Sequence, residues 1–386
     1  MLTIRNAAKI AMLLATALAL LTTAYSAYKG HANDADVNAI LSAYPALKNT
    51  AVDSCATCHT SGKVPDVEKQ RGTRHENGCG YCHAVYVQKK RDIRETLNRY
   101  GTDYLAAGRG VEAVQTLAAK DSDGDGFSND SEFVKGTNPG EPASNPAAPI
   151  APYRVYTSSE IRKLSPIVSA TVFLNTSHNK AGDFYNHYRG NGVYEMLKAA
   201  GISDEAESVD FISLDGFEGA FSIEELKTSW RQAAPVLGLG KTEANPCGWV
   251  NYNAPGLDAK KALPSIRVML AFEENGQKIE TARMDSETGK IKGTGPLRLV
   301  VPQYHMSPPD LPQYAEKSCQ DKAAPEHRFN AAYDHNGGRS SFSIIAIRVN
   351  PLPKGTRDFE WEKVRDQFVA GEKLAIFGAL KNQKSK

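Results

Sequence analysis

Two Cys-x-x-Cys-His units, CATCH and CGYCH, begin 24 residues apart in the first quarter of the chain. This spacing lets a protein hold a c-type haem by two thioethers while the adjacent histidine reaches the iron. A four-cysteine zinc ribbon has a similar spacing, but it would leave both histidines without a role. The sequence therefore predicts two covalent haems, attached and ligated by the residues Cys55, Cys58, His59, Cys79, Cys82 and His83.

Each haem iron has a sixth position that these units do not fill. Residues 33–150 contain no methionine, and His75 is their only other histidine. His75 can complete one iron, which gives the bis-histidine ligation typical of a low-potential electron carrier. The other iron either stays open or takes a histidine from outside this region; the candidates are His31 (if it is not cleaved off), His178, His187, His305, His327 and His335.

An acidic loop, DSDGDGFSNDSE, follows at residues 121–132. It matches the calcium-loop template, with oxygen ligands at positions 1, 3, 5, 7, 9 and 12 and a glycine at the sharp turn. Without a cation the same loop would crowd like charges together. The sequence predicts one structural Ca²⁺, held by Asp121, Asp123, Asp125, the Phe127 carbonyl, Asn129 and Glu132.

Helices are expected to carry these sites. Apolar residues recur at helical spacing in residues 34–49, 86–100 and 111–120. We therefore predict a small, mainly α di-haem domain at residues 33–135, in which the helix after the calcium loop is cut short at 136–140. Residues 136–152 are dense in Pro, Gly and Ala, which predicts a stiff linker.

The pattern changes at residue 153. Short runs rich in Val, Ile and Phe are bounded by turn residues, which indicates strands, and a helix over 191–202 is predicted to close at Gly201. The second domain, residues 153–386, is therefore predicted to be α+β and rich in strands. The predicted strands lie at 169–175, 208–216, 266–276, 297–303 and 341–350.

Residues 1–32 have the pattern of a signal peptide. Arg5 and Lys9 precede an apolar stretch at 10–21, and small residues follow. An uncleaved membrane anchor is the alternative, because residues 10–28 carry no charge. In both cases the rest of the chain is exported to a compartment in which Cys247 and Cys319 can form a disulfide.

Composition narrows the choice of partners. The chain has 386 residues, 41% of them hydrophobic and 23% charged, which is typical of a globular protein longer than one average domain. The formal net charge of +2 gives no electrostatic case for nucleic acid or an acidic membrane as a partner. We expect other redox proteins, such as cytochromes, as partners, and membrane association only if the N-terminal segment is uncleaved.

Four segments of the second domain carry a resemblance. YRGNGVYEMLKAAGI, SVDFISLDGFEGAFSIEEL, VMLAFEENGQ and GTGPLRLVVPQ resemble, in this order, the molybdopterin-binding domain of the sulfite oxidase superfamily. Together with the haem and calcium motifs, the chain resembles the GEGP-motif diheme c-type cytochromes. This resemblance implies a protein exported to the periplasm or the cell exterior of a bacterium.

The resemblance departs from the family pattern at two places. The GEGP motif reads Gly293-Thr294-Gly295-Pro296 here, and its glycines can also simply make the turn into the following strand. The superfamily's metal-binding cysteine has no counterpart in residues 169–186. Molybdopterin is therefore not expected, because such a site needs a soft thiolate ligand.

These features predict an exported, calcium-stabilised di-haem c-type cytochrome that carries electrons between redox partners. No acid–base or nucleophilic constellation is identified. Two enzymes are alternatives: a sulfite-oxidase-like molybdoenzyme with fused haems, which needs the missing cysteine, and a di-haem peroxidase, which places its haems in separate lobes. Both motifs here fall within residues 55–83. A third alternative is that the second domain is a binding module for a larger multihaem assembly.

Overall fold

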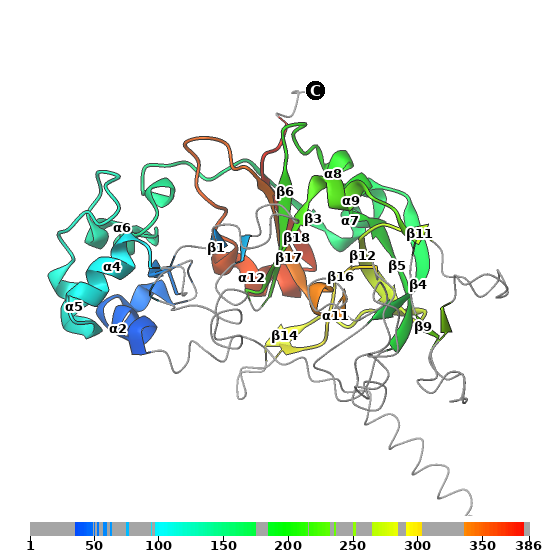
Figure 1. Ribbon diagram of the computed structural model, residues 1–386, viewed down its shortest axis with the longest axis horizontal. Coiled ribbons are helices and arrows are strands. Elements are labelled where there is room, and N and C mark those ends of the chain that lie inside the picture. The colour runs from blue at the N-terminus through cyan, green and yellow to red at the C-terminus, as the bar shows by residue number, and fades with distance from the viewer. Residues whose placement is uncertain are drawn as a thin grey trace, which may run out of the picture.

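The computed structural model is a mixed α/β structure, with helices at one end of its long axis and sheets at the other (Figure 1). Among the described residues, no helix combines the length and the apolar character needed to cross a membrane. The predicted signal peptide, residues 1–32, lies outside the described residues. The structure describes residues 35–48, 50, 52–53, 57–59, 62–63, 75–76, 94, 97–174, 184–214, 216–231, 235–236, 250–251, 265–284, 291–302 and 336–381.

The helical end packs around an aromatic core. Buried Tyr100, Tyr104 and Phe133 form its centre, and the ring centroids of Tyr100 and Phe133 lie 5.4 Å apart, edge to face. Helix α2 lies against α5, and α6 lies against η2. The elements of this end are α2 (Ala35–Ala43), η2 (Pro45–Leu47), α4 (Arg99–Ala106), α5 (Gly110–Thr116) and α6 (Asn129–Lys135). The two short strands β1 (Gly62–Lys63) and β2 (His75–Glu76) pair with each other, and β2 lies against β7 (Glu218–Ser222) of one of the sheets described below.

The helix predicted over residues 86–100 differs from the structure. Residues 86–93 lie outside the described residues, Leu97 pairs with His59 in an isolated bridge, and Asn98 caps a helix that only begins at Arg99. The Asn98 side chain accepts a hydrogen bond from the Gly101 N–H at 2.7 Å. Such a cap satisfies a backbone donor that has no partner within the helix, which favours starting the helix here.

Two five-stranded sheets make up the other end. One has the order β13-β12-β5-β4 with β16 also paired to β12, and the other has the order β3-β18-β17-β6-β7. Their pairings are antiparallel apart from β17 with β18, which is parallel. The strands of these sheets are β3 (Tyr153–Thr157), β4 (Ile167–Leu174), β5 (Phe184–Gly192), β6 (Ser208–Ser213), β7 (Glu218–Ser222), β12 (Met269–Glu274), β13 (Gln277–Lys278), β16 (Arg298–Val300), β17 (Ile344–Asn350) and β18 (Lys373–Gly378).

The five strands predicted for this domain are confirmed as β4, β6, β12, β16 and β17. The predicted helix is α8, and Gly201 ends it with a φ of 82°, a conformation that favours glycine. Shorter elements complete the domain. They are α7 (Ser158–Leu164), α8 (Val193–Ala200), α9 (Ile223–Lys227), β8 (Trp230–Arg231), β9 (Pro235–Val236), β10 (Val250–Asn251), β11 (Ser265–Ile266), β14 (Arg283–Met284), β15 (Ile291–Lys292), α11 (Asn336–Arg339) and α12 (Trp361–Ala370).

The second sheet is buried on both faces. Along β18, Leu374 and Ile376 join the core shared with α7, α8 and α9, while Ala375 and Phe377 join the core beneath α12. This alternation follows from the two-residue period of a strand. A sheet covered on both sides gives a rigid support for side chains placed at its edges.

The Pro/Gly/Ala segment at 136–152 is anchored at both ends, in contrast to a free spacer. A Cβ on Gly140 would come within 2.2 Å of the Asn98 side chain, so this glycine packs tightly on the start of α4. At the other end, the Ala151 N–H donates to the Arg357 carbonyl at 2.8 Å. One short helix, η6 (Pro142–Ser144), lies between these contacts.

Candidate metal and haem sites

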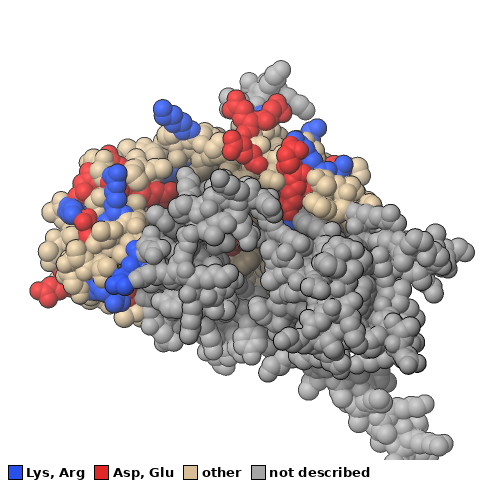
Figure 2. All heavy atoms as spheres, viewed as in Figure 1, with Lys and Arg blue, Asp and Glu red and all other residues tan. Residues whose placement is uncertain are grey.

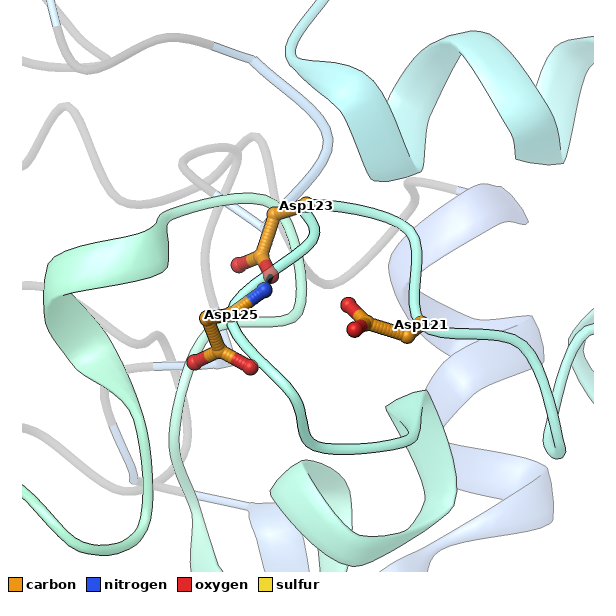
Figure 3. Close-up of side chains that lie close together, drawn as sticks. All are labelled: Asp121, Asp123 and Asp125. Atoms are coloured by element: carbon orange, nitrogen blue, oxygen red, sulfur yellow. Dashed lines mark hydrogen bonds between the residues drawn. The ribbon is translucent and has the colours of Figure 1, made fainter.

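The acidic loop brings three carboxylates together. Oxygen atoms of Asp121, Asp123 and Asp125 all lie within 4.8 Å of one another, in the loop that leads into α6 (Figure 3). Asp121 is exposed, Asp125 half-buried and Asp123 buried. The sequence placed these three side chains at alternate positions of one loop, and the structure confirms that they converge.

The aspartates shape the loop with some of their oxygens and leave others uncommitted. Asp121 accepts hydrogen bonds from the Gly124 N–H at 2.7 Å and the Gly126 N–H at 2.9 Å. One Asp123 oxygen accepts from the Asp125 N–H, and one Asp125 oxygen accepts from the Phe127 N–H. The remaining oxygens of Asp123 and Asp125 are buried and have no hydrogen-bond partner in the described structure.

Glu132 supplies two further buried oxygens. It lies on α6, is fully buried, and neither carboxylate oxygen has a hydrogen-bond partner among the described residues. Burial, followed by the negative charges of Asp123, Asp125 and Asp121, raises the pKa of Glu132 to about 9. Burial and Asp125 likewise raise the pKa of Asp123 to about 6.

These residues fit a hard divalent cation. A buried polar atom without a partner is costly, and the four uncommitted oxygens of Asp123, Asp125 and Glu132 would be satisfied by an ion that prefers oxygen ligands, such as Ca²⁺. The pKa values of Glu132 and Asp123 are raised first by burial and then by the neighbouring carboxylates, and Arg99 offsets this only in part at Asp123. The donor set thus agrees with the calcium loop that the sequence predicts.

Asn129 braces this loop. Its side-chain oxygen accepts from the Ser122 N–H at 3.2 Å, and its side-chain nitrogen donates to the Leu117 carbonyl at 2.9 Å. These bonds tie the start of α6 to the start of the loop, a role that the template does not indicate. Cation ligation by Asn129 and by the Phe127 carbonyl stays a prediction.

The described part of the first Cys-x-x-Cys-His unit is Thr57, Cys58 and His59, and it packs on the first turn of α4. The Asn98 N–H donates to the Cys58 carbonyl at 2.9 Å, and the Asn98 side chain donates to the Thr57 carbonyl at 2.9 Å. A Cβ on Gly101 would come within 1.9 Å of the Cys58 carbonyl oxygen. Only a glycine therefore allows α4 to approach the motif this closely.

An aromatic cluster lies beside this unit. Cys58 is half-buried and packs against the cluster that contains Tyr100 and Tyr104. Tyr100 is fully buried, and its hydroxyl has no hydrogen-bond partner in the described part of the chain. Burial, together with Cys58, raises the pKa of Tyr100 far above its ordinary value.

The other predicted haem residues are placed only in part. His75 lies in β2, which pairs with β1 and lies against the edge strand β7 of the second sheet. His187, one of the candidate sixth ligands, lies on β5 in the other sheet, and its two ring nitrogens lie 2.7 Å from the Ser169 hydroxyl and 3.2 Å from the Thr171 hydroxyl. This pairing disfavours His187 as an iron ligand. Cys55, Cys79, Cys82, His83, His31, His178, His305, His327, His335, Cys247 and Cys319 lie outside the described residues.

The second sheet contains a buried charge cluster that sequence analysis missed. Arg348 on β17 contacts Asp210 on β6 and Glu218 on β7 at 3.2 Å, and Asp358 at 3.0 Å. The Asn350 side chain donates to Asp210 at 2.8 Å. Arg348 is 138 residues from Asp210 and 130 residues from Glu218 along the chain. No short-range spacing in the sequence could therefore have indicated these pairs.

The Gly293–Pro296 motif is a packed turn. A Cβ on Gly293 would come within 2.9 Å of the Thr281 carbonyl oxygen, and one on Gly295 within 2.8 Å of the Glu280 carbonyl oxygen. The Gly295 N–H donates to the Glu280 carbonyl at 2.7 Å, three residues before Arg298, the first residue of β16. The two glycines therefore serve the turn into this strand, as one of the two interpretations of the sequence predicted.

No model of a known protein family and no curated protein matches this chain. Charge gives no further indication of a partner: on the face shown in Figure 2, lysine and arginine side chains lie among aspartates and glutamates over the helical end. The function therefore has to be argued from the motifs and from the geometry of the two sites.

Proposed function

We propose that this chain is an exported di-haem c-type cytochrome that carries single electrons between redox proteins, with its helical domain stabilised by one Ca²⁺. The observation that carries the proposal is the direct packing of the first Cys-x-x-Cys-His unit on α4, beside a loop with uncommitted buried carboxylate oxygens. A bound haem would supply one-electron redox chemistry. Cys55, Cys58 and His59 would hold the first haem, and Cys79, Cys82 and His83 the second.

The second domain supports the carrier proposal more than an enzyme. The glycines of its Gly293–Pro296 motif form a tightly packed turn. The cysteine that a molybdenum site needs is missing from residues 169–186. We propose that this α+β module of sulfite-oxidase-like type is retained without molybdopterin. Stoichiometric molybdenum in the purified protein would favour the enzyme instead.

Haem and calcium content test the proposal directly. The full-length protein, produced in a host that matures c-type cytochromes, should contain two covalent haems by its pyridine haemochrome spectrum and one calcium ion by elemental analysis. The double variant Cys55→Ser/Cys58→Ser should retain one haem. Zinc in place of haem, or no bound calcium, would contradict the proposal.

The ligation of the irons is tested by replacing His75. We expect His75→Ala to convert one haem, and only one, from low spin to high spin, as read by electron paramagnetic resonance. His187→Ala is the matched control and should leave both signals unchanged, because Ser169 and Thr171 already engage its ring. Two unchanged haems in His75→Ala would remove His75 from the ligand set.

A further inference from the structure

The first turn of α4 touches the acidic loop and the first haem motif at the same time. Asn98 and Gly101 contact the motif, and Arg99, between them, reaches the loop. Because these three residues belong to one capped helical turn, they move as a unit. The two sites are therefore joined by a single rigid element.

The contact with the loop is made through its backbone. The Arg99 guanidinium donates a hydrogen bond to the carbonyl oxygen of Asp123, the residue at the third position of the loop. One carboxylate oxygen of the same Asp123 is among those left without a partner. A second link lies further along α4. Asp103 on this helix forms an ion pair at 2.6 Å with Lys120, the residue immediately before the loop.

The contact between α4 and the first haem motif is closely packed. Gly101 lies so close to the Cys58 carbonyl that a methyl group cannot fit between them, and two hydrogen bonds from Asn98 fix the carbonyls of Thr57 and Cys58. Thr57 is itself fully buried and bonded to the Val52 carbonyl at 2.7 Å. A close-packed contact transmits a small displacement instead of absorbing it.

We propose that α4 couples the cation loop to the haem held by Cys58 and His59, with Arg99 as the positioning residue. A cation fixes the position of Asp123, the Asp123 carbonyl fixes Arg99, and the first turn of α4 then fixes the motif. This inference rests on the proposed function, since it requires both the haem and the cation. By linkage, a cation that shifts the reduction potential of this haem must bind the oxidised and reduced proteins with different affinities.

The experiment uses the full-length protein with its haems, titrated with Ca²⁺ and then with EDTA. In the wild type, removal of Ca²⁺ should shift the reduction potential and the visible spectrum of one haem and leave the other unchanged. Arg99→Gln should still bind one calcium, with an affinity lowered no more than about tenfold, and should lose at least half of the shift. Arg189→Gln is the matched control: Arg189 is exposed and pairs with Glu273 at 2.9 Å in the second domain, so it should respond as the wild type does.

The outcomes separate this inference from the proposed function. If both haems and calcium are bound but EDTA changes neither haem, or if Arg99→Gln responds like the wild type, the coupling is wrong. If haem or calcium is absent, the proposed function itself is wrong. Should Arg99→Gln fail to fold, Glu132→Gln provides a second test, because it removes a cation ligand and keeps Arg99. At a Ca²⁺ concentration at which calorimetric titration shows the wild-type site filled and the variant site empty, the variant should show the haem signal of the EDTA-treated wild type. The signal of the calcium-bound wild type under that condition would overturn the coupling.

Discussion

The acidic loop and the Arg348 cluster both bury several carboxylates, but they differ in what opposes the negative charge. In the second sheet, the Arg348 guanidinium lies between Asp210 and Glu218, so the protein provides its own cation. In the loop, the side chains of Asp121, Asp123 and Asp125 converge and Glu132 is buried nearby, while the Arg99 guanidinium bonds to the backbone carbonyl of Asp123. The sheet cluster contains its own positive charge, whereas the loop leaves buried carboxylate oxygens without a hydrogen-bond partner among the described residues.

Buried carboxyls have raised pKa values in both regions, and the difference lies in the charges that act on them. The pKa of Glu132 is raised to about 9 by burial and by neighbouring carboxylates alone. Burial also raises the pKa of Glu218, to about 8, although Arg348 acts in the opposite direction. A buried carboxylate that has no positively charged partner is stabilised by binding a proton or a metal ion. The comparison therefore predicts that a substitution in the sheet cluster affects folding, and one in the loop affects cation binding.

The largest expected effect is that of Arg348→Met. Loss of the guanidinium leaves Asp210 and Glu218 buried without an opposing charge, which costs about 3–5 kcal/mol of unfolding free energy. Urea unfolding of the full-length protein measures this change. Arg189→Met, at the exposed pair with Glu273, should cost about 0–1 kcal/mol. Equal effects of the two substitutions would show that the sheet cluster is not an internal counter-ion.

Glu132→Gln should have a smaller and different effect. It should lower calcium affinity by about 10–100-fold or more, because it removes a charged ligand, and calorimetric titration measures this. In EDTA its melting temperature should stay close to that of the wild type, because Glu132 already carries a proton near neutral pH when its pKa is about 9. A strongly destabilised cation-free Glu132→Gln would contradict the comparison.

The smallest effect for each step in conditions is the change in calcium affinity per pH unit. Near neutral pH the cation-free protein keeps Glu132 protonated, and binding requires the carboxylate, so calcium uptake releases a proton. Affinity should thus rise with pH from about 6, the pKa of Asp123, to about 9, by at most about tenfold per pH unit for one proton. Calcium titrations at pH 6, 7 and 8 give the slope, and an affinity that falls with pH would refute this assignment.

The same raised pKa values fix the sign of the stability of the cation-free protein. A carboxyl whose pKa is higher in the folded chain binds more protons there than in the unfolded chain. The stability contributed by Glu132 is therefore complete below its ordinary pKa of 4.5 and declines as the pH rises towards about 9. Calcium should remove this decline, since it replaces the proton.

Local patterns predicted the regular elements well. The strands of the second domain and the helix ending at Gly201 follow from runs of Val, Ile and Phe and from a glycine able to adopt a positive φ. The start of α4 was missed although its cap, Asn98, binds the Gly101 N–H locally, because Asn98 is also held by bonds to Thr57 and Cys58, about 40 residues earlier in the chain. The ends of the 136–152 segment were missed for the same reason, since Asn98 and Arg357 hold them.

The sequence by itself determined which groups are available for chemistry: two Cys-x-x-Cys-His units and a loop whose carboxylates recur at alternate positions. Those spacings act within a few residues, where backbone geometry alone brings the side chains together. The tertiary structure decided what surrounds them, namely the contact of Arg99 with Asp123, the close packing of Gly101 on Cys58 and the position of Arg348 among its carboxylates. These contacts join distant parts of the chain, so they depend on helix packing and strand register, which no local pattern specifies.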